Sequence, residues 1–349
     1  MLLRLRLTIT LAILVLLIII AIYYYHNRPD PNFDYHNYIV LKPVIPNPID
    51  QGGFAWHLHH AQCAIQLGKL TNKKIIIYFD KGYYYSKKNG ENWWNYFFEP
   101  IGDPKIANKV VRYGDRYGYY NITSLKLPKS SNKPYLYNNT TFQKVMRPIP
   151  GDFQQIYRDN IRLNKKMLAK INNFTKKNFK NDWVIGIHYR GTDKFASYND
   201  NEDLKHNSHF TYQFVVNKLK RHIQQLDTRK RVVIFVASDE QPFVDTIFSN
   251  FHNVISYNSS RSDINTSGLS LNSSKCIASS KTPECKELHK LQQSSIHRGK
   301  NKIAPYKKGE DAVMDIWLLS KCKELFRTHQ GNFSGQPGRI NPQLKVYSL

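Results

Sequence analysis

The sequence predicts an α/β protein built on parallel sheets, and three observations lead to this class. Short apolar runs typical of buried strands lie at residues 184–187 and 231–237. Polar residues follow each run at once, and the stretch between the runs contains the spacing of an amphipathic helix at residues 210–226. Alternating strands and helices with polar strand ends are typical of doubly wound sheets, which bind ligands at the carboxyl ends of their strands.

The composition fits a globular protein with an excess of positive charge. The chain has 349 residues, enough for two domains, and its 41% hydrophobic content argues against global disorder. The formal net charge of +25 favours acidic partners, namely nucleic acid, anionic lipid, phosphorylated nucleotides or acidic glycans. The basic residues are scattered and form no long block or RNA-binding motif, so charge alone selects none of these partners.

The four cysteines give little sign of a metal site. None belongs to a CxxC pair, which argues against structural zinc. Cys276 and Cys285 flank a Ser- and Lys-rich loop and would close a small disulfide in an oxidising compartment. Cys63 and Cys322 lie in apolar helical patterns, so we expect them to be small core residues.

The N-terminus predicts a membrane anchor. Residues 7–25 carry no charge and are long enough to span the ~30 Å hydrocarbon layer as a helix. Arg4 and Arg6 precede the run, which predicts a cytoplasmic N-terminus and a lumenal body, as in a type II membrane protein of the Golgi or ER. A cleaved signal peptide is the alternative, although the run is long for one and no small-x-small cleavage pattern follows.

Eight Asn-x-Ser/Thr sequons give weak support to a lumenal body, because several would occur by chance in so Asn-rich a chain. They begin at Asn121, Asn138, Asn139, Asn173, Asn258, Asn265, Asn272 and Asn332.

Composition shifts divide the chain into consecutive regions. We expect a cytoplasmic tail and anchor helix at 1–28, a stem at 29–50, an N-terminal Rossmann-like domain at 51–150, a helical bridge at 151–180, and a C-terminal Rossmann-like domain at 181–349 with a loop insert at 258–309.

The first domain is predicted to open with a glycine loop, Gly52-Gly53, leading into a helix and then a strand at residues 74–80. A glycine loop at a helix N-terminus suits close approach to a phosphate or a sugar. His59 and His60 are adjacent, so one helix face cannot present both to a metal ion. For either histidine alone, a core position is favoured over a role as a donor in a pocket.

The densest polar stretch follows the strand predicted at 184–187. A guanidinium there can hold two phosphate oxygens with a charge that no accessible pH removes, so Arg190 is the first candidate for an anion-binding residue. The alternative, which the sequence leaves open, is an Arg–Asp pair that pins a surface turn. The polar residues of this stretch are His188, Arg190, Thr192, Asp193 and Lys194.

A second candidate lies near the C-terminus. Asp315 interrupts an apolar helical run, and a carboxylate in that position needs a partner. A strand predicted at residues 324–328 then ends in a polar loop.

Four stretches in this order resemble the fucosyltransferases of the α-1,6 type, including the core-fucosylating and nodulation enzymes, and their protein O-fucosyltransferase relatives. Residues 188–194 match the family's HxRxTDK motif. The other stretches are Gly53-Phe54 with Leu58-His59-His60, the acidic strand end 237–240, and residues 310–320 with Thr328 and Asn332-Phe333-Ser334.

The resemblance implies a GT-B-like fold, with two Rossmann-like domains facing a cleft. It also implies GDP-fucose as donor substrate, inversion at the anomeric carbon, and no required metal or other cofactor. Arg190 would stabilise the charge on the departing β-phosphate, and Asp315 would accept hydrogen bonds from guanine. The donor-binding set comprises Gly53, Phe54, His59, His60, His188, Thr192, Asp193, Lys194, Ser238, Asp239, Asp315, Thr328, Asn332 and Ser334.

The catalytic base departs from the family pattern. Core-fucosylating members have a glutamate four residues past the motif lysine, where this chain has Tyr198. We expect a nearby carboxylate, Asp200 or Glu202, to act with Arg190 in catalysis, with Asp203 a further candidate.

Three hypotheses about function follow from the sequence. The first is a membrane-anchored fucosyltransferase with a nucleotide-sugar donor and a glycan or glycoprotein acceptor. The second is a transferase for another GDP-sugar, and the third a non-catalytic glycan- or polyanion-binding relative. Nucleic acid is disfavoured as a partner because the anchor would place the basic body on the lumenal side.

Overall fold

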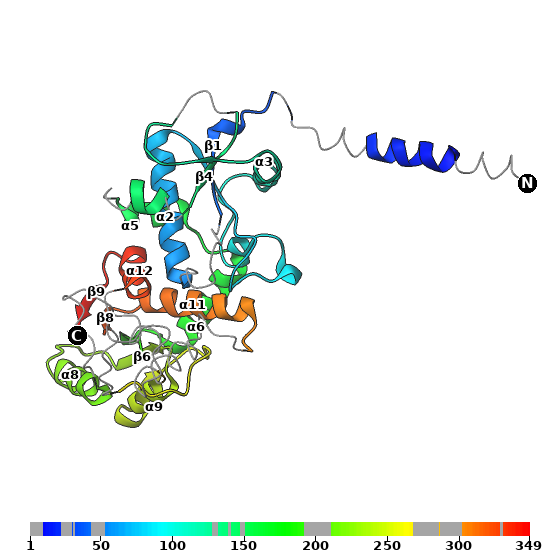
Figure 1. The fold of residues 1–349 in the computed structure, drawn as a ribbon. Coiled ribbons are helices and arrows are strands. Elements are labelled where there is room, and N and C mark those ends of the chain that lie inside the picture. Colours follow the sequence, from blue (N-terminus) through cyan, green and yellow to red (C-terminus); the bar gives the residue numbers. More distant parts are fainter. Residues whose placement is uncertain are drawn as a thin grey trace, which may run out of the picture.

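The structure is a computed structural model and describes residues 10–21, 30, 32–42, 53–127, 132–138, 141–146, 151–191, 211–267, 286, 302–328 and 331–349. Within these residues the chain forms two lobes, each built on one parallel β-sheet, with helix α11 lying between them (Figure 1). The α/β class with parallel sheets that the sequence predicts is confirmed.

The first lobe contains a sheet with the strand order β2-β1-β4-β3, in which all neighbouring strands are parallel. Its strands are β1 (Tyr38–Leu41), β2 (Lys74–Ile77), β3 (Tyr120–Asn121) and β4 (Tyr135–Tyr137), and its helices include α2 (Phe54–Thr71) and α3 (Pro104–Tyr117). Gly68 lets α2 lie close to β2, because a Cβ there would approach the Ile75 side chain to 2.5 Å.

Strand β1 lies inside the stretch 29–50 that we expected to be a stem. All of its residues are buried, and it pairs with both β2 and β4, so it is an inner strand of the first sheet. A short strand buried on both faces shows no alternation of polar and apolar residues, which is why the sequence pattern did not reveal it.

The aromatic segment at residues 82–99 belongs largely to the core of the first lobe. Trp93, Phe97 and Phe98 are buried and surround the ring of Phe54, with ring centroids 5.6 to 6.1 Å away. The short helices η3 (Lys87–Asn89) and η4 (Trp93–Tyr96) lie in this segment.

The second lobe contains a sheet with the order β7-β6-β5-β8-β9, again parallel throughout. Its strands are β5 (Trp183–Tyr189), β6 (Val232–Ser238), β7 (Val254–Ile255), β8 (Glu324–Arg327) and β9 (Lys345–Ser348). Its helices are α8 (Tyr212–Gln224) and α9 (Gln241–Asn250) on one face, and α6 (Lys165–Asn178) and α11 (Pro305–Ser320) on the other.

The alternation along β5 decides which residues reach the site. Ile185, Ile187 and Tyr189 pack on the face covered by α8 and α9. Gly186 faces α11, since a Cβ there would come within 3.0 Å of the Leu319 side chain. His188 therefore also points to the α11 side of the sheet.

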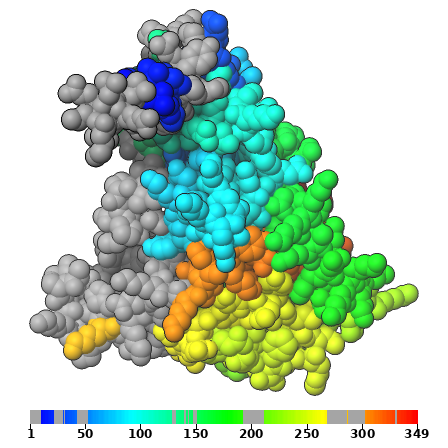
Figure 2. Space-filling model, turned by 90° about the vertical axis from the view of Figure 1, so that its right-hand side faces the viewer, coloured from blue at the N-terminus to red at the C-terminus, as the bar shows by residue number. Residues whose placement is uncertain are grey.

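Helix α11 belongs to both lobes. Gly309 touches the first lobe so closely that a Cβ would lie 2.4 Å from the Phe97 ring, and Trp317 packs against Phe98 with ring centroids 5.6 Å apart. In Figure 2 the orange surface of α11 lies between the cyan surface of the first lobe and the yellow surface of the second. A site built on α11 is thus fixed relative to both sheets.

Buried hydrogen bonds also join the lobes through α12 (Asn332–Ile340). Gln336 Oε1 accepts from Gln62 Nε2 of α2 at 2.8 Å and from the Tyr157 hydroxyl of α5 (Phe153–Asn160) at 2.6 Å. The sequence predicts a polar loop at residues 329–338, whereas residues 332–340 form helix α12.

Several expectations fall partly or wholly outside the described residues. Residues 10–21 of the expected anchor are helical and exposed, and no helix in the described part of the chain is both long and apolar enough to cross a membrane. Cys276, Cys285 and most of the insert 258–309 are not described. Cys63 and Cys322 are buried free thiols, as predicted.

Candidate functional site

A small polar hollow lies at the carboxyl ends of β5 and β6, between α11 and the start of α12. This is the edge at which parallel α/β sheets bind ligands. The residues that line it are His188, Arg190, Ser238, Asp239, Ser259, Ser260, Lys308, Asp311, Ala312, Asp315 and Phe333.

Arg190 is held at the end of β5 from two neighbouring strands. Its guanidinium Nη1 lies 3.2 Å from Asp239 Oδ2, just past β6, and its backbone N–H donates to Thr328 Oγ1, just past β8, at 3.2 Å. The Arg190 side chain is only 12% exposed. An Arg–Asp pair is therefore present, but it forms a wall of the hollow and does not pin a surface turn.

The turn after Arg190 requires glycine. Gly191 N–H donates to Asp239 Oδ1 at 3.0 Å, and a Cβ at this position would lie 1.8 Å from Glu240 Oε1. Glu240 is fully buried and accepts a 2.5 Å hydrogen bond from the Tyr212 hydroxyl. Asp239 thus fixes both the side chain of Arg190 and the backbone that follows it.

His188 stacks on the ring of Phe333 from α12, with ring centroids 4.8 Å apart and planes 17° from parallel. Both rings line the hollow.

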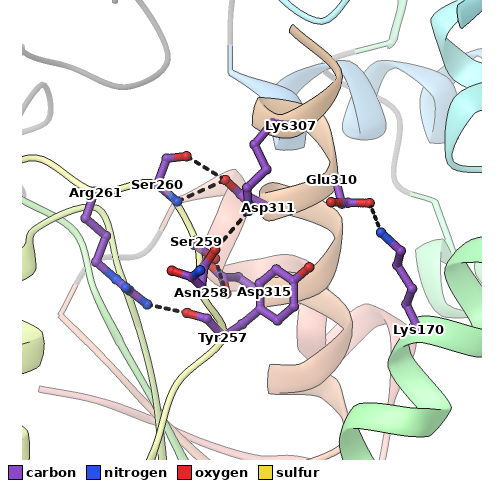
Figure 3. Close-up of polar contacts among 10 residues, drawn as sticks. All are labelled: Lys170, Tyr257, Asn258, Ser259, Ser260, Arg261, Lys307, Glu310, Asp311 and Asp315. Atoms are coloured by element: carbon purple, nitrogen blue, oxygen red, sulfur yellow. Dashed lines mark hydrogen bonds and ion pairs between the residues drawn. The ribbon is translucent and has the colours of Figure 1, made fainter. Parts of the chain in front are cut away.

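Asp315 lies on α11 and is buried (Figure 3). Both of its carboxylate oxygens lie 3.0 Å from the Ser259 hydroxyl, which donates to them. Burial raises the pKa of Asp315 to about 7, and the nearby charge of Arg261 opposes that shift. This carboxyl group can therefore gain or lose a proton near neutral pH.

Asp311, one turn earlier on α11, anchors the chain segment that follows β7. The backbone N–H and the hydroxyl of Ser260 both donate to its Oδ2 at 2.9 Å, and Lys307 Nζ lies 2.5 Å from its Oδ1 (Figure 3). Lys307 also donates to the carbonyl of Asn258 at 2.8 Å. These contacts bring Ser259 and Ser260 into the site.

The structure brings together Arg190, predicted to be catalytic, and four of the residues predicted to bind the donor, His188, Ser238, Asp239 and Asp315. Thr328 and Ser334 are buried next to the hollow without lining it; Thr328 holds Arg190, and the Ser334 hydroxyl accepts from Gly331 N–H at the start of α12. Asn332 is exposed at the first position of α12.

The predicted donor-binding residues of the first lobe do not line this hollow. Phe54 is a core residue, and His60 is buried with its ring against Trp56. Burial lowers the pKa of His60 to about 2. His59 accepts a hydrogen bond from Arg339 Nη1 of α12 at 3.1 Å. Gly53 precedes α2 as its N-cap residue.

Thr192, Asp193, Lys194, Asp200 and Glu202 lie outside the described residues. The site residues that our sequence reasoning did not assign are Ser259, Ser260, Lys308, Asp311 and Phe333. Of these residues, Asp311 could have been found from the sequence, because it lies four residues before Asp315 and so shares its helix face. Two serines in a polar loop give no such signal.

Across the residues that the structure describes, no group of three or more His, Cys, Asp or Glu side chains is placed to hold a metal ion. The site is instead defined by one arginine, one lysine, three carboxyl groups and several hydroxyl groups at a strand edge.

The fold and site define an α/β protein with two Rossmann-like lobes and a polar pocket at a strand edge. The sequence matches no family model and no curated protein. The structure is similar to that of NodZ alpha-1,6-fucosyltransferase co-crystallized with GDP, with a TM-score of 0.50 and 14% identity over 87% of this chain and 92% of that chain. The structure of fucosyltransferase NodZ from Bradyrhizobium is also similar, with a TM-score of 0.50 and 14% identity over 87% of this chain and 93% of that chain. This likeness establishes the shared fold, in agreement with the fold that the motifs imply.

Proposed function

We propose that the protein is an inverting, metal-independent glycosyltransferase that moves fucose from GDP-fucose to a hydroxyl group of a glycan or glycoprotein. The observation that carries this proposal is the fixed, largely buried side chain of Arg190 in a pocket at the strand edge. The likeness of fold to NodZ, whose crystal structure was obtained with GDP, supports the choice of donor.

The chemistry follows from the charge that develops when GDP leaves. Negative charge grows on the β-phosphate as the bond to the anomeric carbon breaks, and a cation already in position stabilises that charge without having to reorganise. Asp239 holds the Arg190 guanidinium in one orientation, and Thr328 holds its backbone. The protein therefore supplies a preorganised positive charge, and inversion requires an acceptor hydroxyl that attacks from the opposite side.

Asp315 supports a guanine nucleotide in particular. An ionised carboxylate can accept two hydrogen bonds from the ring N–H and amino group of guanine, whereas adenine does not offer this pair of donors. The pKa of about 7 means that Asp315 is partly protonated in the free protein and would become ionised when guanine binds.

The base that activates the acceptor hydroxyl is proposed from the sequence alone. Asp200 and Glu202, ten and twelve residues past Arg190 in the sequence, are the candidates, since a carboxylate can accept the proton of the acceptor hydroxyl. Two other functions are kept as alternatives: a transferase for another GDP-sugar, and a non-catalytic relative that binds a glycan or polyanion.

The proposed setting is a type II membrane protein whose body lies in the lumen of the Golgi or ER. It rests on the uncharged run 7–25 and on the arginines that precede it. Protease protection of the C-terminus in sealed vesicles is the measurement that tests this orientation.

The donor class is tested by thermal denaturation of the whole chain with GDP-, UDP- and CMP-sugars at equal concentration. A ligand that binds only the native state raises the melting temperature, so GDP-fucose is expected to shift it and the UDP- and CMP-sugars are not. A larger shift with another GDP-sugar would favour the first alternative. A shift with a UDP- or CMP-sugar alone would contradict the proposal.

A further inference from the structure

Lys308 is a buried cation in the wall of the hollow. Lys308 lies in the first half of α11 and is only 6% exposed. It lines the hollow together with Arg190 and Asp315. Its backbone N–H donates to the carbonyl of Ala304, as is usual in a helix. Burial lowers the pKa of the Lys308 ammonium group, because charge is disfavoured away from water.

Two other cations near the hollow have carboxylate partners, whereas Arg261 donates to the carbonyl of Tyr257. Arg190 pairs with Asp239, and Lys307 pairs with Asp311. Over the described part of the chain, by contrast, the Lys308 side chain makes no hydrogen bond or ion pair. A largely buried lysine without such a partner that lines a pocket leaves its ammonium group available to an anionic ligand in that pocket.

The position of Lys308 on the helix limits what that ligand group can be. Lys308 precedes Asp315 by seven residues, about 10.5 Å along the helix axis at ~1.5 Å per residue. The charges that act on the Asp315 carboxyl group are those of Arg261, Asp311 and Lys307, and Lys308 is not among them. Because Lys308 is thus distant from Asp315, a guanine base held by Asp315 would leave Lys308 facing another part of the nucleotide.

We propose that Lys308 is a second cationic contact for the diphosphate of the donor nucleotide, acting beside Arg190. The proposal rests on the proposed function, since it takes the occupant of the hollow to be a guanine nucleotide. A compact ammonium group suits this role, because three rotatable N–H donors can contact phosphate oxygens without a fixed orientation. Arg190 is oriented by Asp239, whereas Lys308 adds charge that only the ligand neutralises.

The test compares the binding of GDP, GMP and guanosine to the whole chain by isothermal titration calorimetry. Lys308→Met is expected to weaken GDP binding by about 10- to 100-fold, the usual range for a lost hydrogen bond between charged groups. Guanosine binding should stay unchanged, because guanosine has no phosphate. Lys308→Arg should keep GDP binding within a few-fold of wild type.

Lys321→Met is the matched control, because Lys321 is exposed at the C-terminal end of the same helix and carries the same charge. It should bind GDP as wild type does. Lys308→Met should also melt no lower than wild type in the absence of ligand, since it removes an unpaired charge from a largely buried side chain. A purely structural lysine would give a lower melting temperature.

Two outcomes would overturn the assignment. One is equal GDP affinity in wild type and Lys308→Met, and the other is an equal loss for GDP and guanosine, which would place Lys308 on the base. Failure of the wild-type chain to bind either GDP or GMP would instead overturn the proposed function, together with the inference that rests on it.

Discussion

At the scale of single residues, the site depends on side chains that are fixed before a ligand arrives. Asp239 contacts both the Arg190 guanidinium and the Gly191 N–H, and Ser259 contacts both oxygens of Asp315. Preorganisation of this kind lets charge stabilisation act without the cost of reordering the site.

Asp315 gives the site a predicted pH dependence. If guanine binds only the ionised carboxylate, GDP binding should be about tenfold weaker at pH 6 than at pH 8, since the pKa is about 7 in the free protein. Calorimetric titration of GDP between pH 6 and pH 8 measures this. Asp315→Asn should bind weakly and lose the dependence, and a wild-type affinity that does not change with pH would contradict the role.

The raised pKa of Asp315 also makes the stability of the folded protein depend on pH. The folded pKa of about 7 lies above the ordinary value of 3.8, so the native state binds the proton more tightly than the unfolded chain. Asp315 therefore contributes its full stabilisation below pH 3.8, the pKa in the unfolded chain, and this contribution is lost as the pH rises through about 7. Asp245→Asn, at an exposed site on α9, is the control that should leave both pH profiles unchanged.

The predicted site residues that line the hollow are those at strand ends and on a helix face. Arg190 and Asp239 follow apolar runs, and Asp315 interrupts one, so each violates a local pattern in a visible way. Ser259 and Ser260 violate none. Only the contacts with α11 bring them into the site, and tertiary contacts of this kind cannot be read from a polar loop.

At the scale of elements, α11 is the helix on which the site depends. It contributes lining residues along one face, while Gly309 packs on Phe97 and Glu310 pairs with Lys170 of α6 (Figure 3). The helix thus couples the site to the cores of both lobes.

Gly309→Ala should therefore destabilise the protein. The added methyl group would lie 2.4 Å from the fully buried Phe97 ring, and overpacking of this kind costs about 1–3 kcal/mol. Gly335→Ala is the matched control, because a Cβ in that helix meets nothing within 4 Å and should be neutral or stabilise by up to ~1 kcal/mol. Chemical denaturation measures both, and equal midpoints would mean that α11 does not pack on the first lobe as described.

Elements with strong periodicity were predictable, and two others were not. Strands β5, β6 and β8 and helix α8 lie close to the predicted ranges. Strand β1 was missed because four buried residues follow a Pro- and Asn-rich stretch. Helix α12 was missed because its glycines and proline disfavour a helix, and its packing against α2 and α5 outweighs that local preference.

At the scale of the whole molecule, two parallel sheets share one central helix, and the pocket lies where that helix passes the carboxyl edge of the second sheet. The alternation of strands and helices along the sequence predicts this class of fold. The strand orders depend on which edges pair over long distances in the chain, as β1 with β4 does, and the local pattern does not contain that information.

The most direct test of the central claim is turnover of GDP-fucose by the whole chain, followed as release of GDP with and without acceptor glycans. The wild-type protein is expected to release GDP, and Arg190→Ala to do so about 10²- to 10³-fold more slowly with its fold intact. Arg231→Ala, which removes an exposed Arg–Asp pair, is the control and should keep normal turnover. Turnover by Arg190→Ala at the wild-type rate, or no GDP release by the wild-type protein, would contradict the account.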